Sequence, residues 1–406
     1  MNQEQESERN GRSYPRLYFQ QLAIGFALML GMGLPGPFLP ILARELDPIG
    51  ILVGAVTSAW FATRIFIEIP SGVLSDRIGR ARLIVVGLGL SVLGALLCAT
   101  STTIYTLTLG RTVWGLGTAF FYANNTALMM DMFEGDARAR AVGNLQGIEV
   151  IGAFVAAPIG GLIAGKAGYY SVFHIATAMM LISFSIAFLS KDLRQVAGRA
   201  RRTMSDRSVR EDLGNLKNWK FSVICIGIMT RFLVMQGIMS TIFQLYLNQN
   251  LSYSVESIGI IMGVRAAGFC AATFLSGRMA AGKGTKPIIV SGLLIQILCL
   301  YLYTIIGDFN GILAIGLVDG FGSGAVSVTL VILLSEAVAP EVRGTAVGVY
   351  RTFQDFGGAM GPVLFMFVYE AVGRQTSFLL GSALLFASLV LEASLGTENH
   401  RRVRAR

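Results

Sequence analysis

Long apolar stretches alternate with short polar segments along almost the whole chain. Each stretch has about 20 residues, the length that an α-helix needs to cross the hydrocarbon core of a bilayer. The twelve stretches are Leu17–Ile41, Ile51–Leu74, Leu83–Ala99, Ile104–Met130, Ala141–Ala164, Ser171–Leu189, Phe221–Leu245, Ser257–Leu275, Pro287–Ile306, Ile312–Ser335, Thr345–Val368 and Ser377–Leu395. The alternating segments of about 10 residues that build membrane β-barrels are absent. The pattern therefore predicts an all-α membrane protein with twelve transmembrane helices.

The polar segments divide these stretches into two groups of six. We expect a polar N-terminal arm over residues 1–16, a six-helix bundle over residues 17–190 and a second six-helix bundle over residues 221–395. A basic linker over residues 191–220 joins the bundles, and a basic tail covers residues 396–406. Because the first apolar stretch follows a polar arm and exceeds the length of a signal-peptide core, we interpret it as a retained helix.

The composition agrees with a chain that is solvated by lipid. Hydrophobic residues make up 53% of the sequence and charged residues only 14%, whereas about 25% of the residues of a soluble domain are charged. The four cysteines lie in apolar stretches without a C-x-x-C pair, and the two histidines are far apart. We therefore predict no metal site and no cofactor.

The distribution of basic residues predicts the orientation of the chain. The net charge of +9 alone would also suit a nucleic-acid-binding protein. However, the basic residues gather in the central linker, after the second and eighth stretches and in the tail, while the opposite loops contain only Arg44, Lys166 and Arg374. This is the positive-inside asymmetry. It predicts cytoplasmic termini, contact with membrane lipid and no nucleic-acid partner.

The second group of six stretches repeats the first in the same order. Arg265 follows Arg64 by 201 positions, and further along the chain Arg343 follows Arg138 by 205 positions. We expect the four extra residues to lie in the loop after the eighth stretch. Two copies with the same orientation form a parallel repeat, with the substrate pathway between them.

A motif follows the second stretch, where residues 72–82 read GVLSDRIGRAR. It resembles the loop signature G-x-L-[AS]-D-R-x-G-R-[KR]-x of the major facilitator superfamily. The resemblance extends over nearly the whole chain and implies the major facilitator fold, with twelve transmembrane helices in two six-helix bundles. Glycines allow a tight turn here, and Asp76 can bind a helix N-terminus or an arginine.

The motif and its neighbours are candidates for a charged latch that opens and closes during transport. In the second copy Gly277 stands where Asp76 would be, so we expect an asymmetric latch. The predicted gating residues are Gly72, Asp76, Arg77, Gly79, Arg80, Asp131, Arg138, Glu336 and Arg343.

Charged residues inside the apolar stretches are candidate functional residues, because they are costly to place in a membrane. Residues 111–117, RTVWGLG, resemble the R-x-x-x-G-x-G pattern in the fourth helix of the family, and the resemblance implies that Arg111 takes part in proton coupling. A carboxyl group in a cavity of low dielectric constant, beside an arginine, can exchange a proton when substrate arrives. The candidates for proton coupling are Glu149, which we favour, and Arg111, Glu68, Asp319 and Asp355.

The spacing of these charges predicts four ion pairs and a set of substrate contacts. Arg64 with Glu68, and Arg351 with Asp355, lie four residues apart on one helix. We also expect Arg111 to pair with Glu149 across two helices, and Asp319 to pair with Arg351 or Arg231. The candidate substrate-binding residues are Arg64, Arg265, Arg231, Arg351, Gln146 and Gln236.

Small residues follow a ladder in the fifth and eleventh stretches. The fifth contains Gly143, Gly152 and the pair Gly160–Gly161, and the eleventh contains Gly348, Gly357 and Gly361 before a proline. The spacing resembles the antiporter signature of the family, G-x8-G-x3-G-P-x2-G-G. Close helix packing alone would also explain small residues on one face.

The main hypothesis is a secondary active transporter that exports a small organic, drug-like compound in exchange for protons, by alternating access. The sequence most resembles the twelve-helix drug:proton antiporters, and we expect a monomer in the cell membrane. No ATP-binding loop is present, which favours an ion gradient as the energy source. The alternative is uptake or exchange of a small organic anion that is clamped by Arg64 and Arg265. A membrane enzyme or sensor is disfavoured, because the sequence shows no clustered catalytic residues and no large soluble domain.

Overall fold

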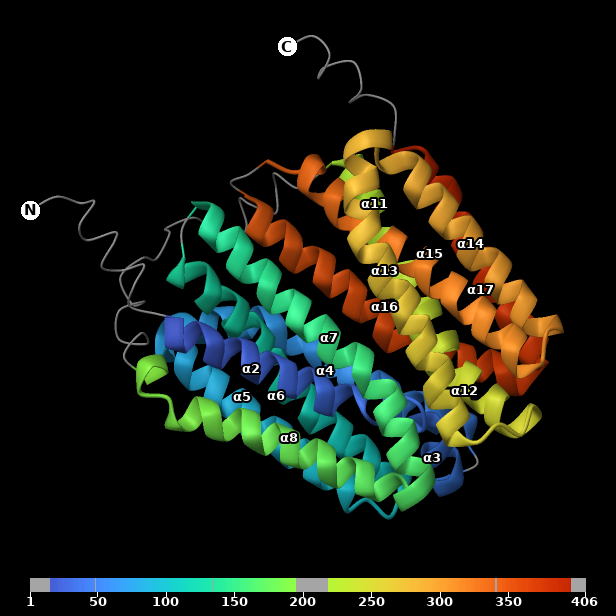
Figure 1. Ribbon diagram of the computed structural model, residues 1–406, viewed down its shortest axis with the longest axis horizontal. Helices are drawn as coiled ribbons and strands as arrows, with labels where there is room; N and C mark the ends of the chain where they lie inside the picture. Colours follow the sequence, from blue (N-terminus) through green and yellow to red (C-terminus); the bar gives the residue numbers. More distant parts are fainter. Residues whose placement is uncertain (1–14, 48, 134, 195–217, 340–341, 396–406) are drawn as a thin grey trace, which may run out of the picture. The chain divides into compact units, whose positions relative to one another are not determined.

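The computed structural model describes residues 15–47, 49–133, 135–194, 218–339 and 342–395, and this part of the chain is helical apart from short turns (Figure 1). The first half contains α2 (Pro15–Gly33), α3 (Leu39–Leu46), α4 (Gly50–Ile78), α5 (Arg80–Ala99), α6 (Ile104–Met132), α7 (Gly135–Ala167) and α8 (Tyr169–Leu189). The second half contains α11 (Trp219–Val234), α12 (Phe243–Leu245), α13 (Val255–Lys283), α14 (Thr285–Ile305), α15 (Phe309–Ala337), α16 (Arg343–Val372) and α17 (Arg374–Ala393). The all-α prediction is confirmed.

The first apolar stretch is interrupted, which corrects the prediction of one continuous helix over Leu17–Ile41. Helix α2 ends at Gly33, and α3 begins at Leu39. Two prolines, Pro35 and Pro37, stand between them and cannot donate backbone hydrogen bonds. The N–H of Gly36 donates instead to the carbonyl of Gly33 at 3.0 Å, which closes a turn.

The seventh stretch is one continuous helical rod with two π-helical segments. Helix α11 continues into η2 (Met235–Ile242), the short α12 and η3 (Tyr246–Asn250). The hydroxyl of Thr241 donates to the carbonyl of Gln236 at 2.8 Å, five residues earlier. π-Helical segments are rare and often lie at functional sites. The candidate residue Gln236 thus lies in an irregular part of its helix.

Four glycines with left-handed backbone conformations mark equivalent turns in the two halves. Gly79 has a φ of 94° and Gly284 of 81°, while Gly168 has a φ of 83° and Gly373 of 94°. The members of each pair are 205 residues apart. Only glycine adopts such angles at no steric cost, so these turns repeat with the sequence.

These turns also correct the position of the four extra residues in the second copy. Helix α4 ends at Ile78, one residue after Arg77, but α13 continues to Lys283, five residues after Arg278. The extra residues therefore lengthen the helix by about one turn, and they do not lie in a loop. The helix ends only where Gly284 reverses the chain.

The helices of the two halves pack in the same scheme. Helix α5 packs on α6 and α8, as α14 packs on α15 and α17, and α2 packs on α7 and α8, as α11 packs on α16 and α17. Glycines bring equivalent helices close together. A Cβ atom on Gly117 would lie 2.5 Å from the nitrogen of Ser91, and one on Gly322 would lie 2.9 Å from the carbonyl oxygen of Gly292. This shared packing supports the parallel repeat.

By its contacts the chain forms two compact units. Their described residues lie within 1–36 and 62–205 for the first unit, and within 37–61 and 206–406 for the second. Residues 37–61 belong to the first repeat by sequence but pack with helices of the second. A Cβ atom on Gly54 of α4, for example, would lie 2.6 Å from the carbonyl oxygen of Pro362 in α16. The bundle boundaries that the sequence suggests stay a prediction.

Nine helical segments within the described residues are long and apolar enough to cross a membrane. The other three predicted stretches lie on α2 with α3, on α6 and on α16, which are helical but do not meet the same criterion. Large apolar side chains such as Phe66 and Phe274 are 74% exposed. Such surfaces suit contact with lipid. The number of twelve spans stays a prediction.

Candidate functional site

Acidic and basic side chains that are less than a tenth exposed lie in the interior of both units, within the described residues. They are Arg64, Arg111, Arg231, Arg265, Asp319, Asp355 and Glu392. An ionised group in such surroundings needs a partner or water, and membrane proteins keep such groups mainly where they act on substrates or ions.

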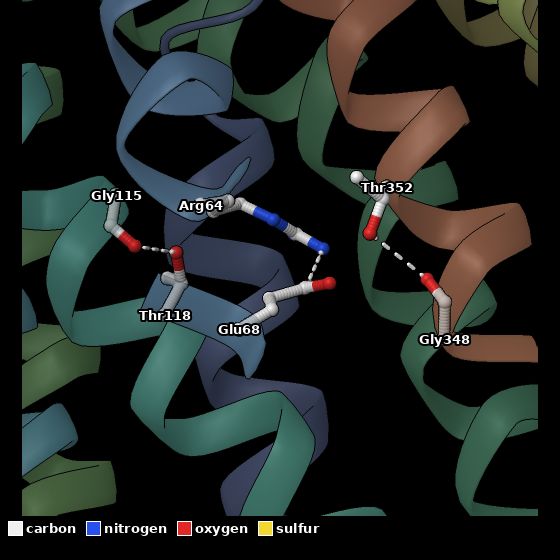
Figure 2. Close-up of polar contacts among 6 residues, drawn as sticks. All are labelled: Arg64, Glu68, Gly115, Thr118, Gly348 and Thr352. Atoms are coloured by element: carbon white, nitrogen blue, oxygen red, sulfur yellow. Dashed lines mark hydrogen bonds and ion pairs between the residues drawn. The ribbon is translucent and has the colours of Figure 1, made fainter. Parts of the chain in front are cut away.

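Arg64 and Glu68 form the predicted pair on α4 in the first unit (Figure 2). Nη2 of Arg64 donates to Oε1 of Glu68 at 2.5 Å. The guanidinium also lies 5.6 Å from the ring centroid of Tyr122 on α6, in cation–π geometry. This contact confirms the predicted pair. The two opposite charges lie one turn apart on the same helix and largely balance each other.

Arg265 and Asp319 form an ion pair in the second unit that joins two helices. Nε of Arg265 on α13 donates to Oδ2 of Asp319 on α15 at 2.6 Å. Asp319 is only 1% exposed. The prediction that Asp319 pairs with Arg351 or Arg231 is therefore wrong.

Close approach of α13 and α15 makes this ion pair possible. A Cβ atom on Gly320 would lie 2.8 Å from the carbonyl carbon of Arg265. Glycine at this position lets the backbones meet, which brings the two charged side chains within direct reach. Tyr303 of α14 interacts electrostatically with both charges.

Arg111 does not form the predicted pair with Glu149. Its guanidinium lies 5.5 Å from the ring centroid of Trp114 on the same helix. Its Nε is buried without a hydrogen-bond partner among the described residues. Glu149 of α7 lies instead beside Gly25 of α2, where a Cβ atom would lie 3.2 Å from its Oε1. The roles of both residues in proton coupling stay predictions.

Arg231 is a buried cation that is held by hydroxyl and carbonyl groups. Its Nη2 donates to the carbonyl oxygen and the hydroxyl of Ser323 on α15, both at 2.8 Å. Nη1 donates to the hydroxyl of Ser327 at 3.4 Å. Within the described part of the chain Arg231 has no carboxylate in ion-pair contact.

The remaining candidates for coupling and binding lie apart from these pairs. Asp355 of α16 is 1% exposed, and its predicted ion pair with Arg351 is absent from the ion pairs of the described side chains. On α7 Gln146 is exposed, and Gln236 in η2 is half-buried. No contact in the described residues tests their roles in substrate binding.

Part of the predicted gating set meets at the turn between α4 and α5. Arg80 forms an ion pair with Asp131 of α6 and donates to the carbonyl of Ala127 at 2.8 Å. Gly79 provides the turn itself, and Nε of Arg138 donates to the carbonyl of Phe133 at 2.9 Å.

The structure leaves the rest of the gating set untested. Glu336 is exposed near the end of α15. Gly72 lies on a helix, as do Asp76, Arg77 and Arg343, whose side chains are outside the described residues.

Sequence reasoning missed two acidic groups. Glu392 of α17 is 2% exposed, and its presence in an otherwise apolar stretch was a usable signal. Glu370 of α16 binds Arg44 of α3 at 2.7 Å. Arg44 and Glu370 are 326 positions apart in the sequence, and no local pattern could have paired them.

Long apolar helices with charges buried between them define a multi-pass membrane protein with an ionisable interior. A model of the Major Facilitator Superfamily matches residues 22–224 and again residues 224–405. The chain therefore belongs to the Major Facilitator Superfamily, and it is a transporter of small molecules and not an enzyme. The predicted all-α major facilitator fold is confirmed.

Similar proteins cover most of the chain. Quinolone resistance protein NorA of Staphylococcus aureus (strain COL) is 23% identical over 341 residues, which are 84% of this chain and 86% of NorA. The class H tetracycline resistance protein of Pasteurella multocida is 27% identical over 379 residues, 90% of this chain and 92% of that protein. The crystal structure of a bacterial homolog of the human lysosomal transporter Spinster, inward-facing and unoccupied, matches with a TM-score of 0.75 at 14% identity and covers 95% of both chains. This last likeness shows the fold alone.

Proposed function

We propose that this transporter exports small, drug-like organic compounds in exchange for protons, by alternating access. The substrate class is supported by the relatives, which are named for resistance to quinolones and tetracyclines and match over more than four fifths of their length. The coupling is carried by one observation, the buried ion pair between Arg265 and Asp319 on two different helices.

A pair that joins two helices can convert proton binding into movement. Protonation of Asp319 removes its negative charge and weakens its attraction to Arg265. The guanidinium then needs another partner, and α13 and α15 lose a contact that holds them together. Deprotonation restores the pair. Asp319 is therefore the first candidate for the coupling carboxyl group, and Glu149, Glu68 and Asp355 remain further candidates.

A second ion pair supports alternating access. Arg44 of α3 and Glu370 of α16 meet at 2.7 Å at the end of the helices where α16 gives way to α17. Arg44 lies in the segment 37–61, which belongs to the first repeat by sequence but packs with the second unit. In our proposal this contact forms when that end of the pathway is closed and breaks when it opens. The same proposal places both termini in the cytoplasm.

The alternative function, transport of an organic anion, finds less support in these contacts. Arg64 is paired with Glu68 and Arg265 with Asp319. A clamp for an anion requires net positive charge at both positions, and the two carboxylates largely cancel it. The anion hypothesis stays a prediction that an uptake assay with organic anions can test.

Purified protein in proteoliposomes provides the test. A fluoroquinolone, a tetracycline and a small organic anion serve as probes, with and without an imposed pH gradient. We expect transport of at least one of the two drugs to rise with the gradient and to collapse when an uncoupler is added. Drug transport that ignores both the gradient and the uncoupler would contradict the coupling.

A matched pair of variants on α15 locates the coupling group. Asp319→Asn removes the charge with little change in shape, and we expect it to abolish the response to the gradient. Asp308→Asn is the control, because Asp308 lies at the start of α15 and caps its first turn by accepting from the N–H of Gly311 at 2.8 Å. Asparagine caps helices about as well as aspartate. Equal behaviour of the two variants would exclude Asp319 as the coupling group.

A further inference from the structure

Glu392 is a buried carboxyl group in the last turn of α17 that the proposed mechanism leaves unused. It is 2% exposed, and the hydroxyl of Ser388, one turn earlier, donates to its Oε1 at 2.8 Å. Its Oε2 is buried and has no hydrogen-bond partner among the described residues. A buried carboxylate with so few hydrogen-bond partners is strongly destabilised, so we expect Glu392 to hold a proton in this state.

A glycine of the neighbouring helix makes room for this carboxyl group. A Cβ atom on Gly227 of α11 would lie 2.9 Å from Cδ of Glu392. Any other residue at position 227 would displace the carboxyl group. The first repeat offers no equivalent, because Ala187 stands 205 positions before Glu392. The group is therefore a feature of the second unit and not part of the shared scaffold.

Few charged groups act on Glu392 from the elements that pack on α17, which are α11, η2, α14 and α16. Arg231 of α11 and Tyr350 of α16 interact with it electrostatically, without direct contact among the described pairs. The segment η2 has no ionisable side chain. The other ionisable residues of these elements and of α17 are Lys220, Cys225, Lys286, Cys299, Tyr301, Tyr303, Arg343, Arg351, Asp355, Tyr369, Glu370 and Arg374. Within the described side chains none of these is hydrogen-bonded to Glu392.

We infer that Glu392, cradled by Gly227 and hydrogen-bonded to Ser388, is a second proton-binding site of the transporter. The inference rests on the proposed proton coupling. It adds to that coupling a buried carboxyl group that belongs to none of the described ion pairs. Glu392 lies one residue before the end of α17 at Ala393, and in this proposal the proton leaves to water as hydronium at that end of the helix. The carboxylate that remains is stabilised by the positive charge of Arg231, which lies one turn after Gly227 on α11 and forms no ion pair with a carboxylate of the described residues.

Infrared spectroscopy of the whole protein in nanodiscs tests proton binding directly. A difference spectrum between about pH 5 and about pH 9 reports buried carboxyl groups that gain or lose a proton. We expect the carbonyl band of a protonated carboxyl group at low pH, its loss at high pH, and its absence in Glu392→Gln. Ser388→Ala should keep the band but shift its frequency, since it removes the hydroxyl that binds Oε1. A spectrum of Glu392→Gln identical to that of the original protein would overturn the inference.

Transport measurements separate this inference from the proposed function. With drug and pH gradient as above, we expect Glu392→Gln to reduce gradient-driven accumulation at least about tenfold and to flatten its pH profile. The control is Glu45→Gln, an exposed glutamate of α3, which should stay within about twofold of the original protein.

Each outcome of this assay has one meaning. If Glu392→Gln keeps the original pH profile while Asp319→Asn loses it, the inference about Glu392 fails and the proposed coupling stands. If the unmodified protein ignores the gradient, the proposed coupling fails, and the infrared band alone decides whether Glu392 binds a proton.

Discussion

Arg64 and Arg265 occupy equivalent positions of the two repeats, but their carboxylate partners lie in different places. Arg64 binds Glu68 on its own helix, four residues away. Arg265 binds Asp319 on another helix, 54 residues away. A pair within one helix moves as a body with that helix, whereas a pair between helices breaks when the helices separate. The two repeats thus have similar helix packing. Among the described buried ion pairs, only the one in the second repeat joins two helices and can respond to their movement.

The largest expected effect comes from breaking the pair that joins two helices. Arg265→Gln leaves Asp319 buried without its partner, and such a loss destabilises proteins by about 3–5 kcal/mol. Thermal unfolding in detergent should show a clearly lower midpoint. The double variant Arg265→Gln/Asp319→Asn should recover part of the loss, because it no longer leaves a buried charge alone.

The first unit provides the comparison for this experiment. Arg64→Gln should cost less, since Glu68 keeps 13% of its side chain exposed and can reach water. The loss should therefore stay below the roughly 3–5 kcal/mol that breaking a fully buried pair costs. If Arg64→Gln destabilised the protein as strongly as Arg265→Gln, the distinction between the two pairs would be wrong.

A smaller effect is expected from the glycine that lets α13 and α15 meet. In Gly320→Ala the new methyl group would lie 2.8 Å from the carbonyl carbon of Arg265. The helices must move apart, and overpacking of this kind costs about 1–3 kcal/mol. The same shift should weaken the ion pair, so we expect both a lower unfolding midpoint and slower gradient-driven transport.

Gly277→Ala is the matched control on the same unit. Nothing lies within 4 Å of a Cβ atom at Gly277, although it also sits inside a long helix. Alanine in a helix is more stable than glycine by about 0.5–1 kcal/mol. A gain or no change is therefore expected, and a loss as large as that of Gly320→Ala would show that packing at Gly320 is not special.

The same contrast explains what the sequence could predict. Helix positions, the repeat and the pair between Arg64 and Glu68 follow from local spacing, because one helix turn determines which side chains are neighbours. The partner of Asp319 depends on how α13 and α15 are rotated against each other, which no local pattern reports. Sequence reasoning therefore assigned Asp319 to Arg351 or Arg231, although the repeat had already marked Arg265.

Other parts of the site were visible in the sequence but were overlooked or misplaced. Glu392 is an acidic residue in an apolar stretch, the same signal that singled out Asp319. The four extra residues of the second copy were expected in a loop, yet the chain stays helical until Gly284 permits a reversal. The ion pair of Arg44 with Glu370 could not be foreseen, because segment 37–61 packs with the second unit only in three dimensions.

The smallest effect on stability is expected at the turn where the repeats differ in charge. Asp131 pairs with Arg80 in the first unit, but their counterparts 205 positions later are Glu336 and Thr285, which cannot form an ion pair. Both partners of the first pair are partly exposed, at 25% and 38% of their side chains. Exposed ion pairs contribute about 0–1 kcal/mol. Asp131→Asn should therefore change the unfolding midpoint little, and less still at high salt, which screens exposed charges.

Transport and stability should separate in this variant if the pair acts as a latch. We expect Asp131→Asn to change the rate of drug transport while the unfolding midpoint stays nearly constant, because a latch alters the balance between two folded states. Glu336→Gln is the control, since Thr285 stands in the second repeat where Arg80 stands in the first. Equal transport rates for Asp131→Asn, Glu336→Gln and the original protein would show that the turn is structural in both repeats, and that the asymmetry between the units lies only in their buried charges.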